Sequence, residues 1–301
     1  MSAFLKRRTC PRTSKGLAGG APALQFSTKD DAYFCIGLTN MAPTIPSALD
    51  HIGKISAARG KRLAVFLDYD GTLTPIVSRP EQAVFSDSMR MVLCNLATKV
   101  PVGVLSGRDL EDVRQRVNLE GIIYAGSHGF DIAGPHGLRK QVATECLPIL
   151  DAAEKELREK LAGIPGALLE RKRFSIAAHY RQVADESVGQ FEQAVNEVVA
   201  GHPELRRMAG KKVYELLPDI DWDKGKAVVW LLETLGLEQP EVLPIYIGDD
   251  RTDEDAFRML QQRGVGIIVT EELRPTAARY ALKNPAEVER FLRELVARLV
   301  Q

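Results

Sequence analysis

The sequence predicts an α/β protein with a doubly wound core and a smaller α+β module inserted into that core. Two observations support this prediction. Short apolar runs, which suit strands buried on both faces of a parallel sheet, alternate with amphipathic helical segments early and late in the chain. In between, the pattern changes to long helical stripes and alternating strand segments. The predicted parts are a tail at 1–46, core parts at 47–133 and 217–301, and an insert at 134–216.

The two core parts consist of apolar runs and helical stripes in succession. Residues 62–67 predict a buried strand because the run is short and apolar and because Asp and Gly follow it. The other core elements are predicted on the same grounds. In chain order they are a helix at 86–98, a strand at 100–105, a helix through Leu110, Val113 and Val117, a strand at 121–125, a helix at 224–235, a strand at 242–247, a helix through Phe257 and Leu260, a strand at 265–269 and a helix from Glu287.

The insert predicts two helices and a small sheet. Apolar residues recur at helical spacing over 147–161 and again over 188–198. Residues 174–180 alternate between two faces, as a half-buried strand does. A turn at 209–210 is expected to join two further strands.

The charge balance argues against a nucleic-acid or membrane partner. The chain has 40 Lys and Arg residues and 40 Asp and Glu residues, so it has no net field that would attract an anionic polymer or lipid surface. Its apolar runs are far shorter than the roughly 18 residues that predict a membrane span, so we expect no transmembrane helix. A small neutral partner fits this composition better.

The cysteines and the basic N-terminal stretch bear on the compartment. Four cysteines are scattered without metal-binding or disulfide-type spacing, which favours a reducing cytoplasm. Residues 1–29 contain basic residues and no acid, a bias that organelle transit peptides share with disordered tails. We favour the disordered tail, and Met41 is an alternative start of the protein.

Acidic residues follow two of the predicted core strands. Asp68 and Asp70 come after the first strand, and because residues two apart on a strand point the same way, both carboxylates should face one site. Four more acids, among them Asp249 and Asp253, follow the strand at 242–247. A structural turn and an acidic helix N-terminus are the alternatives. Open α/β sheets bind ligands at the carboxyl ends of their strands, so the two groups should converge on a divalent cation, for which Mg²⁺ fits best.

Two further signals lie at predicted helix starts. Ser106, Gly107 and Arg108 follow a strand and open a helix, where free backbone N–H groups attract an anion, although a simple helix cap has the same pattern. Lys224 and Lys226 begin another helix, and residues two apart on a helix point to nearly opposite sides. We therefore expect Lys224 to face the site and Lys226 to be a surface charge.

Together these motifs resemble those of the haloacid dehalogenase (HAD) superfamily of phosphotransferases. From about residue 47 onward, five segments are similar to trehalose-6-phosphate phosphatases in particular. They are Asp-Tyr-Asp-Gly-Thr-Leu, Leu-Ser-Gly-Arg, Ala-Gly-Ser-His-Gly, Trp-Asp-Lys-Gly-Lys-Ala and Tyr-Ile-Gly-Asp-Asp-Arg-Thr-Asp-Glu. The resemblance implies a Rossmann-like HAD core with an inserted α+β cap domain, Mg²⁺ as cofactor and a small-molecule sugar phosphate as substrate.

Two segments of the insert are similar to the family's cap motifs. They imply sugar contacts from Glu170, Lys172, His179 and Glu215. Carboxylates, an amine and an imidazole on one sheet face suit sugar hydroxyls, although ordinary exposed sheet charges are the alternative. Arg171 stands where Asp is commoner in the family, but the strand period places it on the opposite face.

The resemblance implies a covalent mechanism. Asp68 would attack phosphorus to form an aspartyl phosphate, and Asp70 would act as acid and then as base. Ser106 and Lys224 would bind the phosphate oxygens. The implied metal ligands are Asp68, Asp70 through its backbone carbonyl, Asp249 and Asp253.

The resemblance also implies substrate contacts from Gly107, Arg108 and His128. For His128, a hinge role and a histidine satisfied by loop backbone stay open. The alternatives for the whole chain are a phosphatase of sucrose phosphate or mannosyl phosphoglycerate, and a non-catalytic sugar-phosphate sensor. Since both Asp68 and Asp70 are present, the sensor is disfavoured. A trehalose-phosphate synthase of the same pathway is the implied protein partner.

Overall fold

The computed structural model describes residues 45–56, 62–77, 83–272 and 274–299, all of which belong to one compact unit. Nearly all of the predicted tail therefore lies outside the described residues. Its last two residues, however, belong to the core. Ile45 packs against buried core residues, and the carbonyl of Pro46 accepts a hydrogen bond from the N–H of Ala281 at 3.0 Å.

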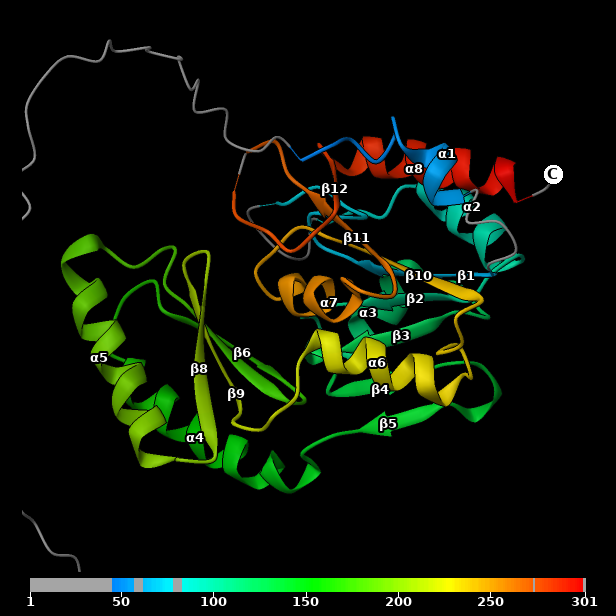
Figure 1. The fold of residues 1–301 in the computed structure, drawn as a ribbon. Helices are drawn as coiled ribbons and strands as arrows, with labels where there is room; N and C mark the ends of the chain where they lie inside the picture. Colours follow the sequence, from blue (N-terminus) through cyan, green and yellow to red (C-terminus); the bar gives the residue numbers. More distant parts are fainter. Residues whose placement is uncertain (1–44, 57–61, 78–82, 273, 300–301) are drawn as a thin grey trace, which may run out of the picture. The chain divides into compact units, whose positions relative to one another are not determined.

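The core contains an eight-stranded sheet in the order β12-β11-β10-β1-β2-β3-β4-β5 (Figure 1). The strands from β12 to β3 are parallel, and β4 and β5 add an antiparallel hairpin at the edge. In chain order the strands are β1 (Arg62–Asp68), β2 (Val102–Leu105), β3 (Ile123–Gly126), β4 (Asp131–Ala133), β5 (Arg139–Gln141), β10 (Val242–Gly248), β11 (Val265–Val269) and β12 (Tyr280–Leu282). The central strands are buried because helices cover both faces, as their apolar runs predicted.

The helices that cover the core sheet pack in two separate layers. One layer contains α1 (Ile52–Ser56), α2 (Asp87–Ala97), α3 (Leu110–Val117) and α8 (Pro285–Arg298), and the other contains α6 (Lys224–Thr234) and α7 (Asp253–Leu260). Ser86, Asp223 and Asn284 begin α2, α6 and α8 by accepting hydrogen bonds from backbone N–H groups of the first turn. None of the helices in the described ranges is long and apolar enough to cross a membrane.

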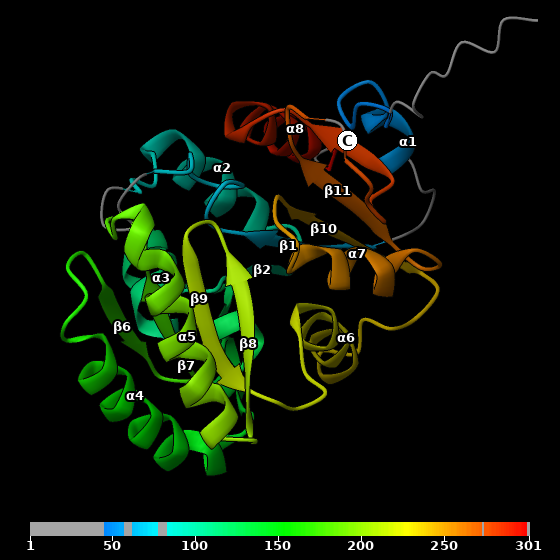
Figure 2. The same cartoon turned by 90° about the vertical axis from the view of Figure 1, so that its left-hand side faces the viewer.

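A second sheet, antiparallel and four-stranded in the order β6-β7-β9-β8, forms the insert (Figure 2). Its strands are β6 (Leu168–Lys172), β7 (Ser175–His179), β8 (Leu205–Gly210) and β9 (Val213–Pro218). Helices α4 (Leu147–Leu161) and α5 (Asp185–Gly201) cover one face through buried residues such as Leu157 and Phe191. We refer to these two helices and this sheet as the cap.

Sheet membership places the start of the insert later than residue 134. Strand β5 pairs with β4 in the core sheet, so the chain leaves that sheet only after Gln141. At the other end, β9 continues to Pro218, two residues beyond the predicted limit of 216. Three-residue strands such as β4, β5 and β12 are too short to show a recognisable period, which is why the sequence did not predict them.

The hairpin between β8 and β9 turns at Lys211 and Lys212, not at Ala209 and Gly210 as predicted. Gly210 pairs with Val213 in the ladder, and Lys212 takes a left-handed φ of 63°. A side chain at Gly210 would meet Cγ1 of Val213 at 2.8 Å. The glycine therefore serves close packing beside the turn.

Candidate active site

The chemically reactive residues meet at the carboxyl edge of the core sheet. Asp68 is the last residue of β1, Ser106 directly follows β2, and Asp249 directly follows β10. Since β1 lies between β2 and β10 and is parallel to both, all three residues come to one edge.

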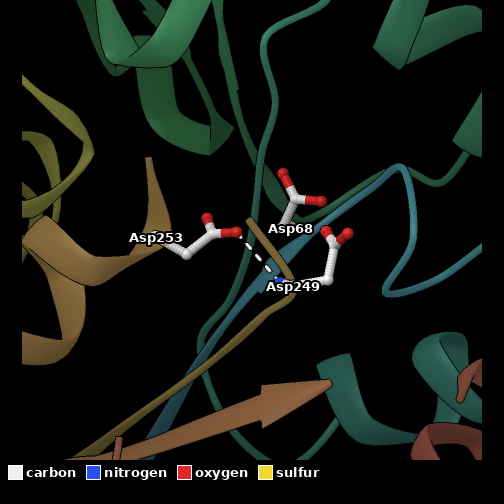
Figure 3. A group of neighbouring side chains, drawn as sticks. All are labelled: Asp68, Asp249 and Asp253. Atoms are coloured by element: carbon white, nitrogen blue, oxygen red, sulfur yellow. Dashed lines mark hydrogen bonds between the residues drawn. The ribbon is translucent and has the colours of Figure 1, made fainter. Parts of the chain in front are cut away.

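Three carboxylates gather at this edge. Asp68, Asp249 and Asp253 each offer an oxygen within 4.8 Å of the other two (Figure 3). Among the described residues, none hydrogen bonds with the buried Oδ1 of Asp249. Burial, followed by the charges of Asp253 and Asp250, raises the pKa of Asp249 to about 7. A divalent cation bound through these oxygens would relieve both the repulsion and the unsatisfied atom.

Asp253 organises the loop after β10. Its wholly buried carboxylate accepts hydrogen bonds from Oη of Tyr246 at 2.7 Å, from Nζ of Lys224 at 2.8 Å, and from the N–H groups of Asp249 and Asp250 at 3.0 and 2.9 Å. Each oxygen thus already has two donors. Direct metal ligation by Asp253 would disturb these bonds, so its geometry suits holding the loop and Lys224 in place.

Lys224 lies among the carboxylates. Its Nζ donates to Oδ1 of Asp68 at 2.6 Å as well as to Asp253. Burial alone would lower the pKa of Lys224, but Asp253 and Asp68 outweigh burial and hold it well above its usual range. Lys226 lies partly exposed beside Asp221. Of the two lysines, the structure brings Lys224 to the site.

The carboxylate of Asp70 is not part of the group of three. It lies beyond the end of β1, and its two oxygens accept hydrogen bonds from Nε and Nη2 of Arg108 at 2.7 Å each. The alternation of side chains along a strand does not extend to Asp70, so it does not fix the direction of that carboxylate. Asp68 and Asp70 line the same cleft but contact different partners. Arg108, which the resemblance assigned to substrate, contacts Asp70 and Asp112.

The loop after β2 approaches both the cap and the loop after β3. Ser106 is buried, and its Oγ accepts a hydrogen bond from the N–H of Arg108 at 3.1 Å. The carbonyl of Gly107 accepts from Nζ of Lys172 in the cap at 3.0 Å. A side chain at Gly107 would meet the ring of His128 at 2.7 Å, so the close approach of these loops requires glycine.

Glu215 is the centre of the polar face of the cap. Its carboxylate accepts from Oγ of Ser175 at 2.6 Å and from Nζ of Lys172 at 2.9 Å, and it lies 3.1 Å from Nε2 of His128 in the core. Burial alone would raise the pKa of Glu215, but Lys172 and His128 hold it well below its usual range. His128 therefore links core and cap through Glu215.

Glu170 and His179 form a second pair on the cap sheet. Nε2 of His179 lies 3.2 Å from Oε2 of Glu170, and this hydrogen bond lowers the pKa of Glu170. Arg171 pairs instead with Asp151 of α4. The strand period therefore separates Arg171 from Glu170 and Lys172, as predicted.

A cleft of about 550 Å³ lies between the core edge and the cap. Residues of both parts line it: Asp68, Asp70, Gly107, Arg108, His128, Lys224 and Asp249 from the core, and Glu170, Lys172, His179 and Glu215 from the cap. Ser106 and Asp253 lie beneath its surface. The core wall offers carboxylates and an ammonium group that suit phosphoryl transfer, and the cap wall offers hydrogen-bonding groups that suit a polyhydroxylated ligand.

Two polar groups behind this cleft were not predicted from the sequence. They are Tyr246, which donates to Asp253, and Asp112, which accepts from Arg108. A hydroxyl within an otherwise apolar strand signals a buried partner, and an acid four residues after an arginine at a helix start signals a pair. Both signals were present in the sequence.

The fold is shared with a known hydrolase. A haloacid dehalogenase-like hydrolase from Bacteroides thetaiotaomicron matches this structure with a TM-score of 0.56 and 17% identity over 79% of this chain and 99% of that one, which shows a common fold. The family model described as trehalose-phosphatase matches residues 66–286. The chain belongs to the trehalose-phosphatase family.

A curated relative agrees with this assignment, and two solved structures share the fold. A probable trehalose-phosphate phosphatase D of Arabidopsis thaliana is 44% identical over 292 residues, which are 92% of this chain and 78% of the relative. The C-terminal domain of C. albicans trehalose-6-phosphate phosphatase matches with a TM-score of 0.73 and 24% identity over 84% of this chain and 99% of that one. The C-terminal domain of Candida albicans trehalose synthase regulatory protein matches with a TM-score of 0.68 and 15% identity over 84% and 100%. These two structures show a shared fold, which alone does not separate a catalyst from a regulatory protein.

Proposed function

We propose that this chain hydrolyses trehalose 6-phosphate to trehalose and inorganic phosphate. The cleft is the observation that carries the proposal, because it has Asp68 and Lys224 on its core wall and Glu170 and Glu215 on its cap wall. The core pair suits attack on a phosphate monoester, and the cap pair suits the hydroxyls of a sugar. The names of relatives at 44% identity support trehalose as that sugar.

The proposed reaction has two steps. A carboxylate oxygen of Asp68 attacks phosphorus, the bond from phosphorus to the sugar oxygen breaks, and an aspartyl phosphate forms. Asp70 enters the first step protonated and gives that proton to the departing sugar oxygen; the carboxylate that results takes a proton from the water that hydrolyses the aspartyl phosphate, which restores the protonated acid. Lys224, already 2.6 Å from Asp68, offsets the charge of the phosphoryl oxygens, and Ser106 would donate its O–H to one of them.

Mg²⁺ is the cofactor that we propose for the carboxylate group. Asp68, Asp249 and the backbone carbonyl of Asp70 would hold it, and Asp253 would keep the loop and Lys224 in position. The buried Oδ1 of Asp249, which lacks a hydrogen bond, fits a hard cation with oxygen ligands. When bound, Mg²⁺ would draw charge from the phosphate and ease attack on phosphorus.

Phosphate release from a panel of sugar phosphates tests this proposal. With Mg²⁺, kcat/KM for trehalose 6-phosphate should exceed that for sucrose 6-phosphate or glucose 6-phosphate at least about tenfold, because hydrogen-bonding sites discriminate strongly. EDTA should abolish release and added Mg²⁺ should restore it. A preference for sucrose 6-phosphate would change the assigned substrate. If none of the three sugar phosphates released phosphate, the proposal would be overturned in favour of a sensor.

Mg²⁺ should raise the melting temperature more at about pH 8 than at about pH 5. The pKa of Asp249 rises from 3.8 to about 7 on folding, so between these values the folded protein binds a proton that the unfolded chain has released. Without metal, the contribution of Asp249 to stability should therefore fall as pH rises through this window. Since Mg²⁺ binds the ionised carboxylate, its stabilising effect should grow over the same window.

Asp249→Asn is the variant that isolates this effect. It should lose most of the Mg²⁺-dependent shift at both pH values, whereas Asp87→Asn, whose side chain is fully exposed, should behave like the unmodified protein. Melting curves recorded with and without Mg²⁺ measure the shift. An equal shift at both pH values would contradict the link to Asp249.

We also propose a cytoplasmic setting, with a trehalose-phosphate synthase of the same pathway as the partner that supplies the substrate. The cysteine spacing supports a reducing compartment, and the described Cys94 and Cys146 are free thiols. Co-purification of the synthase with the tagged chain would test the partnership.

A further inference from the structure

A series of paired charges runs from the cleft to helix α3. Nε and Nη2 of Arg108 donate to the carboxylate of Asp70 at 2.7 Å each, which is the two-pronged geometry of an arginine and carboxylate pair. Nη1 of Arg108 donates to Oδ2 of Asp112 at 2.9 Å. Asp112 in turn accepts from Nε of Arg116 at 2.8 and 3.0 Å. These contacts link Asp112 to Asp70 through Arg108.

Packing as well as charge holds the guanidinium of Arg108. Its side chain is only 9% exposed, and its Cζ lies 5.3 Å from the ring centroid of Tyr69. Burial alone would lower the pKa of Arg108, but Asp70 and Asp112 raise it above its usual range. A planar cation fixed in this way presents its donors in one orientation.

Asp70 gains its orientation from this cation. It lies in the loop after β1, and its side chain is 41% exposed. An exposed loop aspartate samples several rotamers, and a two-pronged pair with a fixed guanidinium selects one of them. Proton transfer to a leaving oxygen requires hydrogen-bond reach, so loss of that rotamer would slow the step.

Asp112 lies outside the cleft. It belongs to α3, four residues after Arg108, and it is not among the residues that line the cleft. Burial alone would raise its pKa, but hydrogen bonds from Arg116 and Arg108 lower it, so Asp112 stays ionised. Of its two arginine partners, Arg108 lines the cleft and Arg116 does not, so Arg108 is the direct contact between Asp112 and the cleft.

We propose that Asp112 is a positioning residue of the reaction, acting through Arg108 to hold Asp70 where it protonates the leaving oxygen. This inference rests on the proposed phosphatase function. It gives Arg108 a positioning role in addition to the substrate contact that the resemblance implied, because its donors meet Asp70 and Asp112. It also predicts a defect that depends on the leaving group and not on the sugar.

Two small substrates separate positioning from structural effects. Glycerol 2-phosphate has an alkyl leaving group that needs a proton, whereas p-nitrophenyl phosphate has an acidic leaving group that departs without one. Both present the same phosphate and neither offers trehalose to the cap. The quantity to compare is kcat/KM, because it covers formation of the aspartyl phosphate and excludes its later hydrolysis, in which Asp70 also acts.

Asp112→Asn is the main variant. It should lower kcat/KM for glycerol 2-phosphate on the order of tenfold and change that for p-nitrophenyl phosphate less than about twofold. Arg108→Lys, which keeps the charge but cannot form the two-pronged pair, should show a larger loss with the same selectivity. In the double variant, Asp112→Asn should cause no further loss of kcat/KM beyond that of Arg108→Lys, because Asp112 acts through Arg108. Glu111→Gln, an exposed neighbour on α3 that pairs with Gln115, is the matched control and should be neutral.

The outcomes distinguish the inference from the function on which it rests. If Asp112→Asn leaves the ratio of kcat/KM for glycerol 2-phosphate to that for p-nitrophenyl phosphate unchanged, the positioning role is overturned. If Asp112→Asn fails to fold, Arg108→Lys is the deciding variant, and an unchanged ratio of the two kcat/KM values in that variant overturns the positioning role as well. Failure of the unmodified protein to hydrolyse any monoester would instead overturn the proposed function.

Discussion

Asp68→Asn is expected to reduce turnover by at least about a thousandfold while the fold stays intact. The change removes the proposed nucleophile and one of the carboxylates proposed to hold the metal. Burial raises the pKa of Asp68 well above its usual range, with Lys224 opposing and Asp253 and Asp249 adding to the shift. An uncharged side chain of the same shape is therefore tolerated there, and Lys224 keeps its bond to Asp253 at 2.8 Å.

Phosphate release under single-turnover and steady-state conditions measures this effect, and a melting curve without Mg²⁺ checks the fold. The melting temperature should not fall below that of the unmodified protein, because the variant removes a buried charge from a group of like charges. The exposed Asp87→Asn serves again as control. Steady phosphate release by Asp68→Asn near the normal rate would rule out the covalent mechanism.

Glu215→Gln is expected to damage hydrolysis of trehalose 6-phosphate about ten- to a hundredfold in kcat/KM. The variant keeps the size of the side chain, but an amide cannot accept from Lys172, Ser175 and His128 together as the carboxylate does. It would therefore disorganise the cap wall that faces the sugar. Hydrolysis of p-nitrophenyl phosphate, which makes no sugar contacts, should fall less than about threefold.

The control for Glu215→Gln is Glu197→Gln. Glu197 pairs with Lys160 at 2.7 Å and neither residue lines the cleft, so its variant should change neither substrate. Parallel kinetics on both substrates measure the selectivity. Equal losses on both substrates in Glu215→Gln would mean that Glu215 supports the fold or the core site, and the sugar assignment would then depend on the relatives alone.

Much of the core could be predicted because its strands are buried on both faces. A run such as 62–67 must be apolar throughout, and its parallel neighbours must end at the same edge. These two constraints predict from the sequence alone that Asp68 and Asp249 lie close together. The choice of Lys224 over Lys226 followed from helix period in the same way. The start of the insert did not follow, because β5 is too short to show a period.

The sequence by itself determined the doubly wound core, the inserted cap, and which residues stand at the strand ends, because burial and periodicity act over a few neighbouring residues. Only the tertiary structure decided the partners of these residues. Arg108 meets Asp70, 38 positions away, and Lys172 meets Gly107, 65 positions away. Such pairs depend on how β1, β2 and the cap sheet pack, and a charged side chain in a linear pattern does not show whether it will face substrate or a partner that neutralises it. The structure therefore gives Arg108 and Asp253 protein partners that their motifs did not reveal.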